Sequence, residues 1–134
     1  MTWLITIHKI EVMITVLLAE EKQIVRRGIR MRLALESDIA IVAETEDGWG
    51  ALQLVREHSP QVVVTGIRLS GLDGFQLTER LSRKIPDCTV VILSLYDDLQ
   101  TQKRASQAGA SFVVSKLESD DKLIAAIRST STKT

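Results

Sequence analysis

The sequence contains one cysteine, Cys88, and two histidines, His8 and His58, among its 134 residues. A lone cysteine cannot form an intramolecular disulfide bond, and these three side chains do not supply the ligand cluster that a zinc site needs. Apolar runs are also short, since none approaches the roughly 18 residues needed to span a bilayer. Residues 1–12 lack the charged start and the small-residue cleavage site of a signal peptide. These absences predict a cytoplasmic protein without a membrane partner.

Neither sign of charge dominates, because 17 lysines and arginines balance 17 aspartates and glutamates. No global positive field therefore favours nucleic-acid binding by this chain, although a local basic patch stays open. Hydrophobic residues make up 45% of the sequence and charged residues 25%, which are ordinary values for a folded globular protein. The length corresponds to one domain with a sizeable core.

Five short runs of apolar and β-branched residues, bounded by turn residues, predict strands. They are Ile14–Ala19, Ile39–Ala43, Val62–Thr65, Thr89–Ser94 and Ser111–Ser115. Helical patterns separate these runs, and one more follows the last run. Strands and helices that alternate through short turns are typical of a parallel sheet with helices on both faces. We therefore expect an α/β fold, a single doubly wound five-stranded parallel sheet with five helices.

The expected helices differ in their apolar surface. After the first strand, apolar or small residues recur at intervals of three and four on one face of a helix, at Ile24, Gly28, Met31 and Leu35. The arginines of this helix fall largely on its other faces, either as a solvated surface or as a basic surface for a partner. The helix over residues 97–108 has little to bury, so we expect it to be loosely held.

The two ends of the chain differ from its middle. Residues 1–12 are rich in β-branched and aromatic residues, and they precede Met13, where the first strand pattern opens. They are either an upstream extension that the natural product lacks or an extra segment that packs on the domain. We take residues 13–128 as the domain and the polar residues 129–134 as a tail or the start of a linker.

The stretch Pro60–Gly74 joins the third expected strand to a glycine-rich loop. In parallel sheets, ligand and catalytic groups lie just past the carboxyl ends of the strands. The residue at this place after the third strand is Gly66, which has no side chain. The central position of the expected site therefore carries no functional group.

Several short sequences at the ends of the expected strands form a set. They are Val-Leu-Leu-Ala-Glu-Glu-Lys at 16–22, Val-Arg-Arg-Gly at 25–28, Asp-Gly at 47–48, Ala-Leu at 51–52, Ile-Arg-Leu-Ser-Gly-Leu-Asp-Gly at 67–74, Ser-Leu-Tyr-Asp-Asp at 94–98, Ala-Gly-Ala at 108–110 and Lys116. Together they resemble a bacterial response-regulator receiver domain of the NarL/LuxR type, over about residues 14–128. The resemblance implies a flavodoxin-like receiver fold.

In that family an acidic pair after the first strand and an aspartate after the third hold Mg²⁺, and the aspartate accepts a phosphoryl group from a histidine kinase. A serine or threonine after the fourth strand and a lysine after the fifth then read the phosphoryl group. The resemblance assigns the acidic pair to Glu20 and Glu21 and the two reading residues to Ser94 and Lys116.

The sequence departs from the family at the phosphoacceptor, which the resemblance assigns to Gly66. Glycine has no atom that can attack phosphorus, so phosphorylation at this position is chemically impossible. With one carboxylate lost, Glu20 and Glu21 form at most a weak site for a divalent ion. Lys116 is then available to pair with one of these glutamates, and Ser94 could be only a strand-end hydrogen-bonding residue.

These residues support two hypotheses about function. The first is a phosphorylation-independent receiver, neither an enzyme nor dependent on a cofactor, that acts as a protein-interaction or dimerisation module in signal transduction and transcription regulation. It would bind a protein partner or a second copy of itself, and reach DNA only through a domain absent from this chain. Its interface candidates are Leu123, Ile127 and Tyr96. The alternative is a ligand or ion sensor in the degenerate pocket of Glu20, Glu21, Gly66, Ser94 and Lys116.

Overall fold

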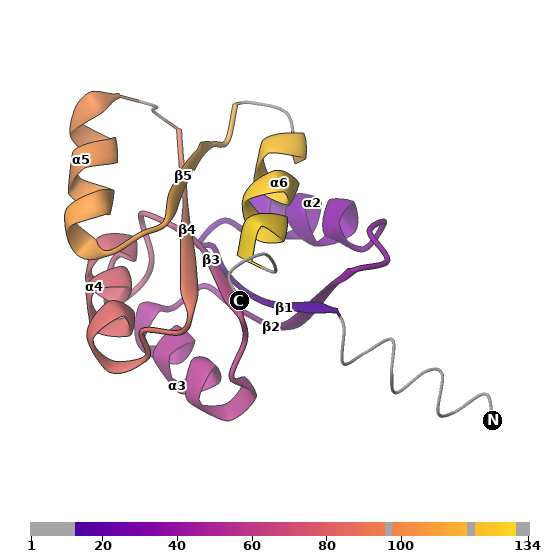
Figure 1. The fold of residues 1–134 in the computed structure, drawn as a ribbon, viewed down its shortest axis with the longest axis horizontal. Helices are drawn as coiled ribbons and strands as arrows, with labels where there is room; N and C mark the ends of the chain where they lie inside the picture. The colour runs from indigo at the N-terminus through magenta and orange to yellow at the C-terminus, as the bar shows by residue number, and fades with distance from the viewer. Residues whose placement is uncertain (1–12, 96–97, 118–119, 131–134) are drawn as a thin grey trace.

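The centre of the protein is a sheet of five parallel strands, seen in the computed structural model, which describes residues 13–95, 98–117 and 120–130 (Figure 1). The strands are β1 (Ile14–Ala19), β2 (Ile39–Thr45), β3 (Val62–Gly66), β4 (Thr89–Ser94) and β5 (Phe112–Ser115). Their order in the sheet is β2-β1-β3-β4-β5. The third strand is one residue longer than expected and ends on Gly66 itself, so this glycine belongs to the carboxyl edge of the sheet.

Helices cover both faces of this sheet (Figure 1). They are α2 (Gln23–Leu33), α3 (Gly48–His58), α4 (Gly74–Lys84), α5 (Leu99–Ala108) and α6 (Asp120–Ser129). One core lies between the sheet and the pair α2 and α6, and the other lies between the sheet and α3, α4 and α5. Alternate strand residues enter the two cores, since Val16 faces the first and Leu17 the second. The predicted doubly wound α/β fold is confirmed.

The apolar face that the sequence indicates on α2 lies on the surface. Ile24 is 81% exposed, Met31 59% and Leu35 76%. The helix contacts the core instead through Ile29 and Leu33, which recur at an interval of four on another face. The prediction that Ile24, Met31 and Leu35 form the inner face is therefore wrong. The exposed set, Ile24, Met31 and Leu35, is called the α2 stripe below.

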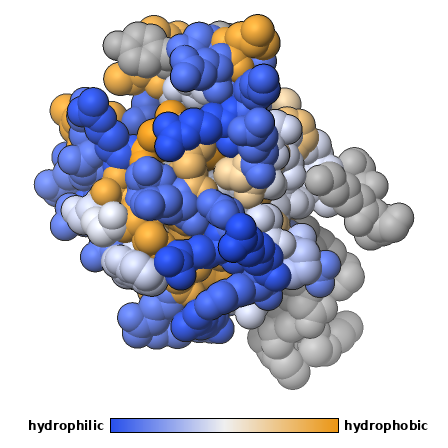
Figure 2. Space-filling model, turned by 90° about the vertical axis from the view of Figure 1, so that its left-hand side faces the viewer, coloured by the Kyte–Doolittle hydropathy of each residue, from blue (hydrophilic) through white to orange (hydrophobic). Residues whose placement is uncertain are grey.

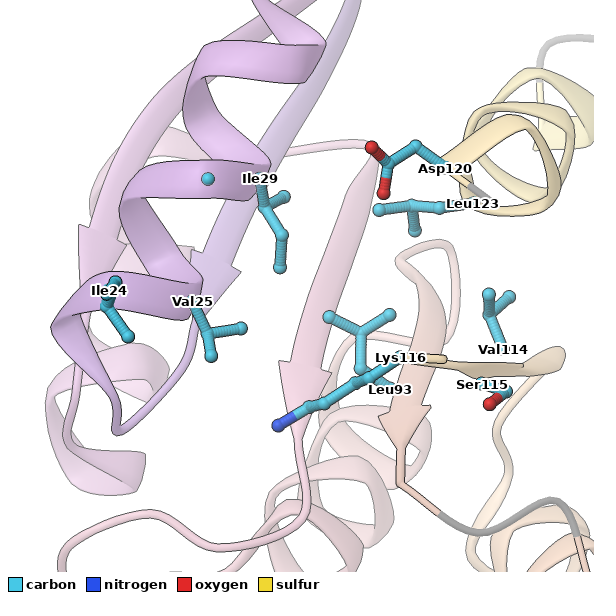
Figure 3. Close-up of a pocket in the computed structure, with 10 residues that line it drawn as sticks. Ile24, Val25, Ile29, Leu93, Val114, Ser115, Lys116, Asp120 and Leu123 are labelled. Carbon is cyan, nitrogen blue, oxygen red and sulfur yellow. The ribbon is translucent and has the colours of Figure 1, made fainter. Parts of the chain in front are cut away.

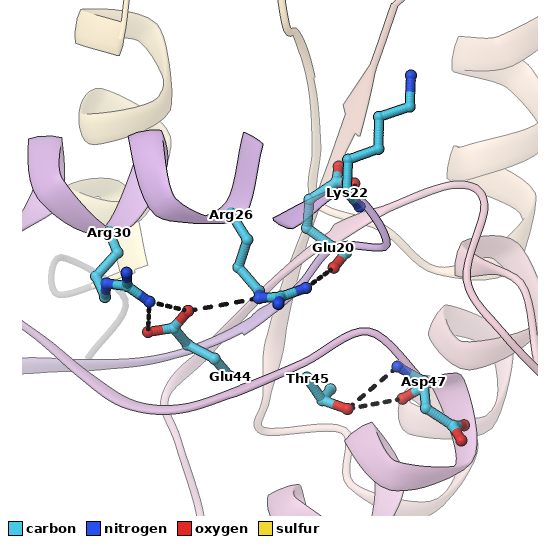
Figure 4. A network of polar contacts seen from close by, with 7 residues as sticks. All are labelled: Glu20, Lys22, Arg26, Arg30, Glu44, Thr45 and Asp47. Carbon is cyan, nitrogen blue, oxygen red and sulfur yellow. Dashed lines mark hydrogen bonds and ion pairs between the residues drawn. The ribbon is translucent and has the colours of Figure 1, made fainter. Parts of the chain in front are cut away.

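The arginines of α2 mostly bind acidic groups of the same chain. Arg26 and Arg30 both reach the carboxylate of Glu44 on β2, at 3.7 and 3.0 Å (Figure 4). Arg32 contacts Asp121 on α6 at 3.5 Å. These pairs turn the charged side of the helix toward β2 and α6 while the α2 stripe faces outward. Most of the arginines are therefore engaged within the domain rather than forming an open basic surface.

The helix α5 buries only Ala105 among its ten residues, which agrees with the small apolar surface expected there. The side of the molecule that carries α4 and α5 is mainly hydrophilic, with small apolar patches scattered over it (Figure 2). Asp98 begins the helix by accepting a hydrogen bond from the Thr101 amide, and Gly109 ends it in the left-handed conformation. Local capping rather than burial thus defines the bounds of this helix.

Candidate functional site

Four of the residues selected from the sequence meet at the carboxyl edge of the sheet. The strand register explains the meeting, since Ala19 of β1 pairs with Thr65 of β3 and Ser94 of β4 pairs with Ser115 of β5. The next residue along β1 and along β5 therefore lies over the same edge as the end of β3. The structure places together Glu20, Gly66, Ser94 and Lys116.

Glu20 is the buried acid of this site, with a side chain only 2% exposed. One carboxylate oxygen, Oε1, accepts a hydrogen bond from Lys116 Nζ at 2.5 Å, and Oε2 accepts one from the Lys22 amide at 2.9 Å. The main-chain carbonyl of Glu20 accepts a further bond from the Arg26 guanidinium at 2.7 Å (Figure 4). Both carboxylate oxygens are thus satisfied within the protein, as a buried charge requires.

Gly66 lies directly beneath this carboxylate. A methyl group placed on Gly66 would lie 2.8 Å from Oε1 of Glu20, 3.4 Å from its carboxyl carbon and 3.6 Å from Nζ of Lys116. The first distance is shorter than a van der Waals contact between carbon and oxygen. The volume that a side chain at position 66 would enter is therefore taken by the Glu20 carboxylate, which comes from the neighbouring strand.

Lys116 directly follows the edge strand β5 and reaches the Glu20 carboxylate along the carboxyl edge of the sheet. Its amide donates a hydrogen bond to the Ser94 carbonyl at 2.7 Å, which fixes the main chain just after β5. Its side chain then extends toward the N-terminal end of α2 (Figure 3). Between β5 and β1 the sheet contains β4 and β3, so the ion pair crosses two strands. The expectation that Lys116 pairs with one of the two glutamates is confirmed, and the partner is Glu20.

Glu21 does not join the site, because its side chain is exposed while that of Glu20 is buried. The divalent-ion site suggested by the resemblance requires several carboxylates turned toward one point. Here one carboxylate is bound to an ammonium group, the adjacent one faces solvent and position 66 has none. Among the described residues, no three acidic, histidine or cysteine side chains lie together so as to hold a metal ion. The donor set does not fit Mg²⁺.

The loop after β3 keeps a closed shape although its strand ends in glycine. The Gly74 amide donates to the Ile67 carbonyl at 2.6 Å, and Asp73 forms a capping box with Gln76 at the start of α4. A side chain at Gly74 would collide with the carbonyl of Gly66. Loop and helix therefore hold the end of β3 in place without any contribution from a side chain at position 66.

A groove of about 250 Å³ lies beside this site, between α2 and α6, and sequence reasoning did not find it (Figure 3). It is open on the α2 side because Gly28 has no atom within 4 Å of the place where a side chain would begin. Its lining residues are Ile24, Val25, Gly28, Ile29, Leu93, Val114, Ser115, Lys116, Asp120 and Leu123. The one available signal was a glycine in the middle of an arginine-rich helix, where glycine is unfavourable unless space is needed.

The interface candidates require a correction. Leu123 is only 4% exposed and Ile127 fully buried, since α6 uses both side chains to cover the sheet. They belong to the core of the domain and are not available as surface anchors. Tyr96 lies outside the described residues. The described exposed apolar side chains include the α2 stripe and also Leu99 and Leu117.

A family model of the response regulator receiver domain matches residues 16–128. The chain therefore belongs to the response-regulator receiver family. It is 31% identical over 115 residues to the transcriptional regulatory protein DegU of Brevibacillus brevis, a match that covers 86% of this chain and 49% of that protein. It is 32% identical over 114 residues to the oxygen regulatory protein NreC of Staphylococcus epidermidis, covering 84% and 52% of the two chains. The chain spans about half the length of these curated relatives.

Solved structures show the same fold. The receiver domain of the regulator NarL from Mycobacterium tuberculosis superposes with a TM-score of 0.85 at 24% identity, covering 91% of this chain and 98% of the other. A two-component response regulator of the LuxR family from Aurantimonas has a TM-score of 0.84 at 28% identity, covering 90% and 86%. The resemblance to NarL/LuxR-type receivers is thus confirmed at the level of family and fold. No helix in the described part of the chain is long and apolar enough to cross a membrane.

Proposed function

We propose that this receiver domain works without phosphorylation and serves as a protein-interaction module in signal transduction and transcription regulation. The observation that carries the proposal is the occupied space above Gly66, where the Glu20 carboxylate lies hydrogen-bonded to Lys116. Phosphoryl transfer needs a carboxylate nucleophile, a divalent cation on oxygen ligands and a positive group for the developing charge. Glycine supplies no nucleophile, Glu20 is not available to a cation, and the lysine charge is already neutralised.

The same geometry disfavours the alternative of a ligand or ion sensor in the vacated pocket. Loss of the side chain at position 66 leaves no open space there, because Glu20 fills it. The Glu20 carboxylate is only 2% exposed and already accepts a hydrogen bond at each oxygen, so a new ligand would have little access to it. The pocket therefore supports a structural role better than a binding role.

Phosphorylation can be tested directly by incubating the purified chain with acetyl phosphate and Mg²⁺, followed by mass spectrometry of the intact protein. We expect no added phosphoryl group, and no change in thermal stability with beryllofluoride and Mg²⁺. The isolated receiver domain of RcsB from Salmonella enterica is a suitable positive control, since its structure was obtained with the phosphomimetic BeF₃⁻. Stoichiometric phosphorylation of any residue of the wild-type chain would refute the proposal.

The α2 stripe is the surface that we propose for self-association. Its three large apolar side chains are exposed on α2 and just past its C-terminal end, and one of them, Ile24, also lines the groove beside Gly28. In a two-fold dimer the same surface serves both copies, so a projecting stripe next to a groove can be complementary to itself. The stripe of one copy would enter the groove of the other and bury apolar side chains of both. DNA contact would then depend on a domain outside this chain, as the length of the curated relatives suggests.

Glutamate substitutions at two equally exposed positions test whether the α2 stripe is the dimer interface. Ile24 on α2 and Leu99 at the start of α5 are each 81% exposed, so glutamate at either position should leave the monomer fold intact. Light scattering over a range of concentrations should show a dimer for the wild type and for Leu99→Glu, and a monomer for Ile24→Glu. A dimer that only Leu99→Glu dissociates would place the interface elsewhere. A wild type that stays monomeric at high concentration would end the dimer proposal.

A further inference from the structure

We propose that Glu20 is a built-in counterion that replaces the missing acceptor side chain and holds Lys116 in one position. The inference rests on the proposed absence of phosphorylation at Gly66, and it concerns what the chain has put in place of that reaction. Three separate observations support it: the space above Gly66, the bonds that fix Glu20 and the path of Lys116.

The first observation is that the ion pair depends on the absence of a side chain at position 66. The Glu20 carboxylate passes over Gly66, so close that a single methyl group there would contact it at 2.8 Å. An aspartate at this position would add a carboxylate beside the existing one, and two adjacent negative charges in a buried site repel each other strongly. Gly66 and the buried pose of Glu20 are therefore parts of one arrangement.

The second observation is that Glu20 is fixed from several directions. Its amide donates to the Thr45 carbonyl at 3.0 Å, Oε2 accepts from the Lys22 amide, and its carbonyl accepts from Arg26. Arg26 is itself bound to Glu44 of β2 (Figure 4). The main chain of Glu20 is therefore held by two hydrogen bonds, and its carboxylate is oriented toward Lys116 by the bond from the Lys22 amide.

The third observation is that Lys116 links two strands that are not neighbours in the sheet. Its main-chain amide is bonded to Ser94 at the end of β4, while its ammonium group is bonded to Glu20 just after β1. Its side chain is 19% exposed, so solvent competes only partly for the charge. With its charge met inside the chain, Lys116 has one stable position, and no phosphoryl group is needed to attract it. The end of β5 is thereby set in a single state.

Chemical rescue tests this arrangement. Glu20→Ala removes the carboxylate and leaves the ammonium group beside a small cavity, so we expect the Tm to fall by about 5–10 °C. Acetate can enter such a cavity and restore the charge, and at tenfold its Kd it should raise the Tm by roughly 4 °C over equal chloride. The control is the exposed neighbour, since Glu21→Ala should change neither the Tm nor its response to acetate.

A double-mutant cycle covers the case in which Glu20→Ala does not fold. Glu20→Gln keeps the shape of the side chain and removes its charge, and Lys116→Met keeps the length of the lysine without its charge. If the two side chains act as a pair, the Tm loss of the double variant is clearly smaller than the sum of the two single losses. Additive losses, or no difference between acetate and chloride, would overturn the inference.

A conformational measurement distinguishes a single position of Lys116 from an ion pair that only stabilises the fold. In NMR spectra of the wild type, the backbone amides of Lys116 and Leu117 should each give one sharp resonance. In Glu20→Gln these resonances should broaden or split. Two sets of wild-type signals would contradict a single state. These results are independent of the phosphorylation assay, because phosphorylation of the wild type would refute the proposed function even if the cycle showed coupling. Additive losses would refute only the present inference.

Discussion

Replacing Gly66 by alanine measures how firmly the space above β3 is occupied. Gly66 ends a β-strand and is not among the described residues with positive φ, so alanine fits the backbone. On its own the change should stabilise the folded chain by about 0.4–1 kcal/mol, because alanine restricts the unfolded state. The new methyl group, however, would lie 2.8 Å from Oε1 of Glu20, and this carboxylate is bonded on both oxygens.

The opposing cost follows from the ion pair. Removing one partner of a buried pair costs about 3–5 kcal/mol. Here the partner is displaced and not removed, and the Lys116 side chain is 19% exposed, so we take about half of that value, roughly 2 kcal/mol. The net expectation for Gly66→Ala is a loss of about 1–1.5 kcal/mol in the free energy of unfolding.

Gly28→Ala provides the matched control. The substitution is chemically the same, but Gly28 lies within α2 and has no atom within 4 Å of the new methyl group. Alanine should therefore stabilise the folded chain by about 0.5–1 kcal/mol through helix propensity. Urea denaturation at low protein concentration, followed by circular dichroism, gives both values. If Gly66→Ala proved as stable as Gly28→Ala, the Glu20 carboxylate would not be held over Gly66 and the reasoning would fail.

Three further predictions concern other parts of the chain. Burial raises the pKa of the Cys88 thiol to about 11, so at pH 8 a thiol reagent should modify the native chain at least about 100-fold more slowly than the unfolded chain. Asp73→Ala removes the capping box with Gln76 and should cost about 1 kcal/mol in urea denaturation. The hydrogen bond from Arg128 lowers the pKa of Asp38, so this carboxylate stabilises the folded state above about pH 4 and loses that effect as the pH falls through its lowered pKa. The Tm difference between wild type and Asp38→Asn should accordingly shrink from neutral toward strongly acidic pH.

The central strands were predictable because their sequences are short, continuous apolar runs. All residues of β3 and β4 are buried, and such short apolar runs between turn residues are typical of central strands in a parallel sheet. The helices were harder, because a helix can carry two apolar faces. On α2, Ile24 and Met31 recur as regularly as Ile29 and Leu33. In the folded chain Ile29 and Leu33 pack on the core, while two arginines of the helix bind Glu44 of β2, and neither set of contacts can be read from the α2 sequence alone.

The prediction that Leu123 and Ile127 are interface anchors was wrong for a related reason. Leu123 and Ile127 lie at helical spacing, and an apolar helix face must cover the sheet before it can bind a partner. The α6 sequence alone does not show how much of the sheet α2 leaves uncovered. An apolar side chain on α6 can therefore be mistaken for an exposed one. Exposure in the folded chain distinguishes the two cases, since Leu123 and Ile127 are buried while Ile24 is 81% exposed.

The arrangement at the carboxyl edge shows why the roles of Glu20 and Glu21 could not be separated from the sequence. The two residues are chemically identical neighbours just after β1. In the folded chain the side chain of Glu20 is buried and that of Glu21 is exposed. The inward carboxylate of Glu20 lies over Gly66 and binds Lys116. In this structure the two residues fit together sterically, because the Glu20 carboxylate lies against the place where a side chain at position 66 would begin. The same carboxylate binds the ammonium group of Lys116, so the absence of a side chain at Gly66 and the ion pair belong to one local packing arrangement.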